Sequence, residues 1–199
     1  MIYTGNYKNF EDTLYVTCSI SGDRGKDANY EGKCYPALAP KRDFWKTWKN
    51  NIGIIPEEEN TRYYIHEFYE QVLSKLDPEE VYRELDHTVL LCYEEPQDFC
   101  HRHLVAAWLE LLLDIEVIEF NGKTKEQIEV PSYMKDWLEE EMKKKNMHGF
   151  ESVRAAYLFE KGDRADAKGY GQYAAYLRSD ADMVEEEYKA NKAKLKQKK

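Results

Sequence analysis

The pattern of hydrophobic and polar positions changes near residue 120. Before that point, short apolar runs at 2–4, 13–20, 88–93 and 115–120 contain many β-branched residues, which indicates strands. The run at 13–20 is apolar at nearly every position and predicts a strand covered on both faces, as in a parallel sheet. The long polar stretch 21–40, punctuated by glycine and proline, is predicted to be a loop.

Helical spacing fills the intervals between these runs. Apolar residues recur every three or four positions in 63–76, and a shorter pattern of this kind covers 40–52. Asp77 followed by Pro78 is typical of a helix start, because the carboxylate accepts hydrogen bonds from free amides and proline suits the first turn. Strand, helix and strand follow one another from 88 to 120, which predicts a βαβ unit with a right-handed crossover.

The segment after Phe120 is charged, rich in helix formers and short of strand patterns. Ser132 is expected to cap one helix, a second is expected to stop at Gly162, and a third to begin near Gly171, before a frayed lysine-rich tail. The predicted fold is therefore α/β: a Rossmann-like, three-layer, mostly parallel sheet with helices on both faces, over residues 1–120. Residues 121–199 are predicted to form an all-helical C-terminal extension.

Composition narrows the classes of function. The chain carries a net charge of −9, which argues against extensive nucleic-acid binding because a phosphate backbone requires a basic surface. Its longest nearly uncharged apolar run, 104–109, is too short to span a membrane, and the N-terminus shows no leader pattern. Four cysteines without dense spacing indicate reduced thiols, so the expected location is the cytoplasm.

The stretch "VLLCYEEPQDFCHRH", residues 89–103, is the best candidate for chemistry. It predicts a strand end, a loop and a helix starting near Asp98, where free helix amides favour anions. There Cys100 is a candidate nucleophile with a lowered pKa, His101 a candidate acid or base, and Arg102 a candidate clamp for phosphate or carboxylate.

A plainer interpretation stays open for the same stretch. The cysteines can be small buried hydrophobes, Asp98 a simple cap, and the basic residues partners of Glu94 or Glu95. A zinc site from Cys92, Cys100 and His103 lacks a second close pair of ligands, so neither a metal nor another cofactor is expected.

Three segments resemble a known family. "LLCYEEPQDFCHRHLVAAWL" resembles the signature of the domain of unknown function 488 family, in which a strand and a Cys-x-Glu element precede a Cys-His-Arg helix start. "YPALAPKRDFWKTWK" is similar to its Leu-Ala-Pro-Lys segment, and "YYIHEFYEQVLSKLDPEEVYREL" to its helical pair. The resemblance covers about residues 1–120 and implies an α/β fold and the position of a site, without an established activity.

Transferred residue by residue, the motif marks Cys92 and Glu94 after the strand and Cys100, His101 and Arg102 at the helix start. Upstream it marks Ser19, Ser21, Gly22, Pro40 and Lys41. The serines can instead stabilise a turn, and Lys41 can be an ordinary surface lysine. Tyr30, Tyr35 and Tyr64 are candidates for the crevice wall or for packing.

Three functions follow as hypotheses. The first is a crevice for a phosphate- or carboxylate-bearing small molecule, for example a nucleotide, with hydrolase or transferase chemistry by Cys100 or Glu94 and Arg102 as the clamp. The second is a non-catalytic module in which the helical extension contacts a protein partner or a second copy. The third is a Cys/His metal or redox site.

Overall fold

The structure, a computed structural model, describes residues 1–146 and 148–197 and contains two compact units, Met1–Glu141 and Met142–Lys199. The sequence placed the end of the α/β domain at residue 120, whereas the first unit continues to residue 141. The reason lies in helix α6 (Tyr133–Lys144), where Glu140 pairs with Arg62 and Glu141 with His66. Both partners lie on α3 (Glu57–Gln71), so residues 121–141 pack with the α/β unit.

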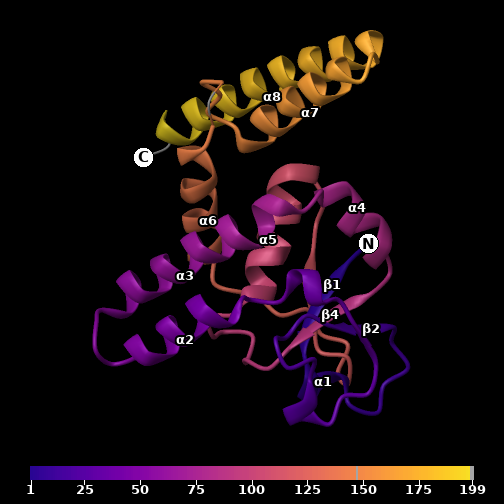
Figure 1. Ribbon diagram of the computed structural model, residues 1–199, viewed down its shortest axis with the longest axis vertical. Coiled ribbons are helices and arrows are strands. Elements are labelled where there is room, and N and C mark those ends of the chain that lie inside the picture. Colours follow the sequence, from indigo (N-terminus) through magenta and orange to yellow (C-terminus); the bar gives the residue numbers. More distant parts are fainter. Residues whose placement is uncertain (147, 198–199) are drawn as a thin grey trace. The chain divides into compact units, whose positions relative to one another are not determined.

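Within the described residues, the first unit contains a five-stranded sheet (Figure 1). The strands are β1 (Tyr3–Asn6), β2 (Thr17–Ser19), β3 (Lys33–Cys34), β4 (Val89–Cys92) and β5 (Ile118–Glu119). Their order is β3-β2-β4-β1-β5, and every pairing between them is parallel. The predicted Rossmann-like α/β fold with a helical C-terminal segment is confirmed.

Alternation along β4 separates the two faces of the sheet. Val89 and Leu91 pack with Tyr7 and Phe10 of the short helix α1 (Tyr7–Phe10) and with Phe120. Leu90 and Cys92 point to the opposite face, because successive side chains of a strand alternate. Helix α5 (His101–Leu113) covers that face, and its Trp108, Leu104 and Leu109 are fully buried.

The predicted strand at 13–20 is too long. Only Thr17–Ser19 forms a strand, β2, whereas Leu14 and Val16 precede it and are exposed. The predicted loop 21–40 contains η1 (Lys26–Ala28), strand β3 and η2 (Pro36–Leu38). Strand β3 was not predicted, because two residues are too few to show the alternation of apolar and polar positions that marks a strand.

The helices agree with their sequence signals at most ends. They are α2 (Arg42–Asn51), α3, η3 (Leu73–Lys75), α4 (Pro78–Leu85) and α5. Asp77 caps α4 as predicted, since its Oδ1 accepts hydrogen bonds from the amides of Glu79 (2.9 Å) and Glu80 (3.3 Å). Helix α3 begins at Glu57, earlier than the apolar pattern, because Glu57, Glu58 and Glu59 favour the positive end of the helix.

The predicted start of α5 near Asp98 is wrong. The amide of Asp98 donates to the Glu95 carbonyl (3.0 Å) in a turn, and the helix begins at His101. Cys100 occupies the capping position in extended conformation, without a side-chain cap bond. The sulfur of Cys100 instead lies beside Glu94 and His101.

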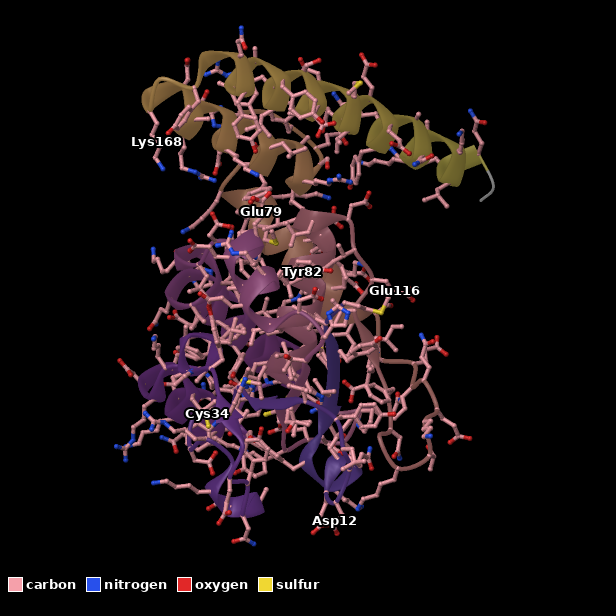
Figure 2. The ribbon with its side chains drawn as sticks, turned by 90° about the vertical axis from the view of Figure 1, so that its right-hand side faces the viewer. Asp12, Cys34, Glu79, Tyr82, Glu116 and Lys168 are labelled. Carbon is pink, nitrogen blue, oxygen red and sulfur yellow. The ribbon has the colours of Figure 1, made fainter. Side chains whose placement is uncertain are left out.

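The second unit is a pair of packed helices, α7 (Val153–Ala167) and α8 (Gly171–Gln197), with Lys168 at the turn between them (Figure 2). Helix α7 does not stop at Gly162 as predicted. A Cβ there would lie 3.2 Å from the carbonyl oxygen of Ala174, so glycine permits the close approach of α8. The lysine-rich end is helical to Gln197 rather than frayed, and residues 198–199 lie outside the described residues.

Among the helices of residues 1–146 and 148–197, none combines the length and the apolar composition that crossing a membrane requires.

Candidate functional site

A pocket of about 600 Å³ lies beyond the carboxyl ends of β2 and β4. These strands are parallel neighbours, with Ser19 opposite Leu91, so their following loops meet at one edge of the sheet. The chain leaves β2 toward β3 and leaves β4 toward β5, and such a divergence opens a ligand crevice in α/β sheets. The lining comprises Ser21, Gly22, Asp23, Asp27, Pro40, Arg42, Trp45, Trp48, Lys49, Tyr64, Cys92, Tyr93, Glu94, Phe99, Cys100 and His101.

Aromatic rings from two helices and a loop form one wall. Trp48 of α2 packs against Tyr64 of α3, with ring centroids 5.3 Å apart, and against Phe99, at 5.7 Å. The ammonium of Lys49 lies 5.0 Å from the Trp48 ring centroid, and Arg42 also lines the pocket from α2. The wall thus combines flat apolar surfaces with two cationic side chains.

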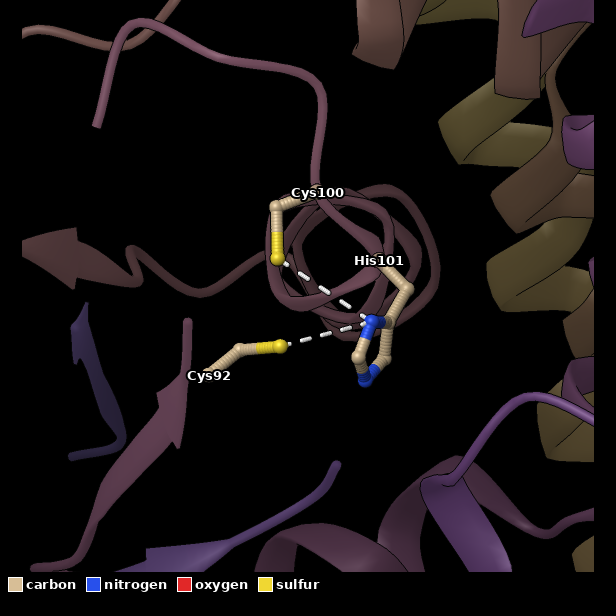
Figure 3. Close-up of side chains that lie close together, drawn as sticks. All are labelled: Cys92, Cys100 and His101. Carbon is tan, nitrogen blue, oxygen red and sulfur yellow. Dashed lines mark hydrogen bonds between the residues drawn. The ribbon is translucent and has the colours of Figure 1, made fainter. Parts of the chain in front are cut away.

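Four side chains converge at the buried end of the pocket, and Figure 3 shows three of them, Cys92, Cys100 and His101. Cys92 ends β4, Cys100 occupies the N-cap position of α5, and His101 is the first residue of that helix. Nδ1 of His101 lies 3.7 Å from Sγ of Cys92 and 4.0 Å from Sγ of Cys100. Oε2 of Glu94 lies 3.2 Å and 3.0 Å from the same two sulfur atoms.

A backbone hydrogen bond fixes the orientation of His101. Its Nε2 lies 2.9 Å from the carbonyl oxygen of Ile20, an atom that can only accept, so Nε2 carries a proton and donates. Nδ1 therefore faces the two sulfur atoms. The rings of Phe68 and His101 pack in an edge-to-face contact, with centroids 5.7 Å apart.

The surroundings lower the pKa of the Cys100 thiol well below its usual range. Burial alone raises the pKa by disfavouring the charged form, but the hydrogen bond from Cys92 and the positive charges of Arg102 and His101 outweigh burial. The negative charge that Cys100 gains in turn raises the pKa of His101, despite the opposing effect of burial.

The pKa values of Cys92 and Glu94 rise, as that of His101 does, whereas the pKa of Cys100 falls. Burial, together with the hydrogen bond and charge of Cys100, raises the pKa of the Cys92 thiol well above its usual range. Burial and the charge of Cys100 also raise the pKa of Glu94. The cluster can therefore hold a thiolate on Cys100 and protons on its neighbours, an arrangement suited to nucleophilic attack with proton transfer.

Arg102 lies outside the pocket lining and is fully buried. Its Nη2 lies 3.1 Å from Oε1 of Glu119, and its Nε lies 3.3 Å and 3.2 Å from the two carboxylate oxygens. His103, an alternative zinc ligand in the sequence, turns the same way, with Nε2 3.5 Å from Glu119. The guanidinium is thus engaged by Glu119 rather than presented to the pocket as a clamp, and it acts on Cys100 through its charge.

The two serines at and just after the end of β2 belong to a hydrogen-bond network. Ser19 is buried outside the pocket, where its hydroxyl lies 2.6 Å from that of Tyr7, whereas Ser21 lines the pocket beside exposed Gly22. Ser21 donates to Asp23 (2.8 Å), and Asp23 also accepts hydrogen bonds from Tyr93 and two backbone amides. Burial raises the pKa of Asp23, but these donors lower it to about 2, so the carboxylate organises the loop.

Of the other predicted residues, Pro40 and Tyr64 line the pocket, whereas Lys41, Tyr30 and Tyr35 do not. Lys41 is exposed between Pro40 and Arg42, which do line it. Tyr30 bonds Thr17 at 3.0 Å, and Tyr35 donates to Glu84 at 2.7 Å. Of the three tyrosines proposed as walls, Tyr64 alone is in the lining.

The sequence reasoning missed the contribution of α2. Arg42, Trp45, Trp48 and Lys49 all line the pocket. Their spacing of three, three and one places them along one side of a helix, a signal that was present in "RDFWKTWK". The apolar pattern of the segment includes Trp45 and Trp48 and predicted the helix, but not its place at the pocket.

The family model described as the active DUF488-N3 subclade matches residues 8–112, slightly more than half of the chain. The matched range includes both strands that open the pocket, α2, and the Cys92–His101 cluster. Searches of curated proteins and of solved structures found no match.

Proposed function

We propose that this chain, which belongs to the DUF488-N3 family, is a cytoplasmic hydrolase or transferase. Its Cys100 thiolate attacks a small anionic molecule. The observation that carries the proposal is the position of Cys100. Its sulfur lies at the buried end of a 600 Å³ pocket, at the start of α5, beside His101 and Glu94. The description of the matching subclade as active supports a catalytic use of the pocket.

The pocket wall indicates the kind of substrate. Trp45 and Trp48 offer flat faces to a planar ring, and Arg42 and Lys49 offer charge to a phosphate or carboxylate. A nucleotide combines the two features in one molecule. The chain's net charge of −9 disfavours long nucleic acids. The two cations of the pocket wall are therefore better matched to one small anionic ligand.

The residues support one reaction sequence. The Cys100 thiolate attacks an electrophilic carbon or phosphorus of the substrate and forms a bond to sulfur while the bond to the leaving group breaks. The carboxylic acid of Glu94, 3.0 Å from Sγ, protonates the leaving group. Water or an acceptor hydroxyl then displaces the sulfur, and the Glu94 carboxylate takes its proton, which restores the starting state.

Residue-resolved labelling tests the proposal. The metal-free full chain is treated with iodoacetamide, with and without a panel of nucleoside monophosphates and sugar phosphates, and each cysteine is followed by mass spectrometry. We expect Cys100 to react faster than buried Cys18, and one class of ligand to slow Cys100 without slowing half-buried Cys34. Equal reactivity of Cys100 and Cys18, with no protection by any ligand, would contradict the proposal.

A second function, binding of a protein partner or a second copy, is supported by α8. Tyr170, Tyr173, Tyr176 and Met183 are exposed there or beside its start. Light scattering of the full chain tests self-association. A monomer at all concentrations, for wild type and for a Tyr173→Ser, Tyr176→Ser variant alike, would exclude the second copy.

A further inference from the structure

The reactive cluster also has the composition of a metal site. Cys92 Sγ, Cys100 Sγ and His101 Nδ1 all lie within 4.8 Å of one another, and all three residues are buried. We propose that these three atoms bind a single zinc ion, which masks Cys100 and switches off the thiol chemistry of the pocket.

The distances fit tetrahedral zinc. Zinc bonds of about 2.3 Å to sulfur and about 2.0 Å to nitrogen place ligand sulfur and nitrogen atoms about 3.6 Å apart. The observed separations from His101 Nδ1 are 3.7 Å to Cys92 and 4.0 Å to Cys100. Binding therefore requires only small side-chain rotations at the ends of one strand and one helix.

The hydrogen bond of His101 supports the same assignment. A histidine that binds zinc through one nitrogen generally donates the other N–H to a carbonyl or carboxylate, which fixes the ring. His101 donates Nε2–H to the carbonyl oxygen of Ile20 at 2.9 Å and presents Nδ1 to the two sulfurs. The orientation for metal binding thus exists before any ion arrives.

The fourth position faces Glu94 and the pocket. Oε2 of Glu94 lies 3.2 Å and 3.0 Å from the two sulfurs, so it can complete the coordination or hold a bound water. The sequence offered Cys92, Cys100 and His103 as zinc ligands and no fourth one. In the structure, Oε2 of Glu94 is a candidate for the fourth ligand. His103 instead contacts Glu119, and His101 takes its place.

The consequence for the pocket follows from the electron pairs of Cys100. A sulfur lone pair that forms a bond to zinc is not available for attack on a substrate, and the ion also occupies the space beside Glu94. Zinc occupancy and alkylation of Cys100 therefore exclude one another. Zinc binding at these three atoms is argued from their geometry alone, whereas its effect on the thiol chemistry rests on the proposed function.

Zinc and cobalt binding to the full chain provide the test. Under reducing conditions, competition with a chromophoric chelator should give one zinc ion per chain, and Co²⁺ should show a thiolate-to-cobalt charge-transfer band. Cys92→Ser and Cys100→Ser should each weaken binding about 100-fold and remove much of the band. Cys34→Ser is the matched control and should bind as wild type does.

A measurement on the wild-type chain keeps the test valid even if the cysteine variants misfold. In the wild-type chain, added zinc should slow alkylation of Cys92 and Cys100 and leave Cys34 unchanged. Failure of zinc to bind or to protect these two cysteines overturns the metal site. If Cys100 of the metal-free chain is still labelled rapidly and is protected by a nucleotide, the proposed function survives that failure. Zinc binding to a chain whose metal-free Cys100 is inert would instead support the metal site and contradict the proposed function.

Discussion

The guanidinium of Arg102 and the carboxylate of Glu119 form a buried ion pair, with Nη2 3.1 Å from Oε1. Arg102 is on α5 and Glu119 on β5, so the pair connects the helix that begins at His101 to the edge of the sheet. It also holds a positive charge close enough to Cys100 to lower the pKa of its thiol. One interaction therefore contributes to both packing and the electrostatics of the site.

Glu119→Gln should destabilise the first unit strongly. The substitution leaves the Arg102 guanidinium buried without a counter-charge, and breaking a buried pair in this way costs about 3–5 kcal/mol. Urea unfolding followed by circular dichroism measures the loss. Glu11→Gln is the control, because Glu11 pairs with Lys123 at the exposed surface and should cost less than about 1 kcal/mol. Equal losses in the two variants would show that Glu119 contributes no more than a surface acid.

The same carboxylate should make stability depend on acid pH. Burial raises the pKa of Glu119, but the hydrogen bonds and charges of His103 and Arg102 lower it by more. The folded pKa therefore lies below the ordinary value of 4.5. The ionised carboxylate therefore stabilises the fold above about pH 4.5, and this contribution is lost as the pH falls through the folded pKa. Urea midpoints measured between pH 3 and 7, a range chosen to span that value, should fall less steeply in Glu119→Gln. Parallel curves would assign the acid sensitivity to other groups.

The sequence predicted the elements that have a clear apolar run or a capping residue. The run at 88–93 contains β4, and Asp77 caps α4, because an apolar run and a capping side chain are both visible in the local sequence. The patterns failed where tertiary contacts decide. Helix α7 passes through Gly162 because α8 packs closely there, and β3 is too short to have a pattern of its own.

The candidate site was predictable in place but not in detail. Parallel β2 and β4 bring Ser21 and Cys92 to one crevice, as the strand pattern implied. The direction of each side chain was not predictable, because it depends on partners distant in sequence. Arg102 turns to Glu119, and His101 is held by Ile20, a residue more than eighty positions away.

Trp48→Ala should weaken the binding of a ligand with a planar ring. Stacking on an aromatic side chain contributes about 1–3 kcal/mol per base, which corresponds to an increase in Kd of about 5- to 150-fold. Isothermal titration with the nucleotide selected by the labelling screen measures the change. Trp137→Ala removes a tryptophan of α6 that is outside the pocket lining and should leave Kd unchanged. A loss shared by both variants would point to destabilisation instead of stacking.

Arg42→Ala should weaken the binding of an anionic ligand specifically. A hydrogen bond to a charged group contributes about 1.5–3 kcal/mol, so Kd for the nucleotide should rise about 10- to 150-fold. The corresponding nucleoside, which lacks the phosphate, should bind equally well to the variant and to wild type. Lys41→Ala is the neighbouring control, because Lys41 is exposed outside the lining. A larger effect at Lys41 than at Arg42 would transfer the anion contact to Lys41, the residue that the family resemblance marks.

Gly25→Ala should damage the loop that carries Ser21 and Asp23. Gly25 has a left-handed φ of +81°, and its amide donates to Ser21 Oγ (2.9 Å) and to Asp23 Oδ1 (3.1 Å). An added Cβ would lie 2.7 Å from Cβ of Tyr30, which requires a backbone shift in addition to the strained φ. We expect a loss of about 2–4 kcal/mol, of which about 1 kcal/mol is the left-handed conformation and the rest overpacking.

Gly53→Ala separates those two contributions. Gly53 has a similar φ of +75°, but a Cβ there meets no atom within 4 Å, so its alanine variant should lose only about 1 kcal/mol. Urea unfolding compares the variants, and nucleotide titration then shows whether the Gly25 variant also binds less tightly. Weaker binding with a native-like unfolding midpoint would mean that the loop controls the pocket without supporting the fold. Equal stability losses in the two variants would show that the contact with Tyr30 relaxes at no cost, and the ordered loop around Asp23 would then tolerate a side chain at position 25.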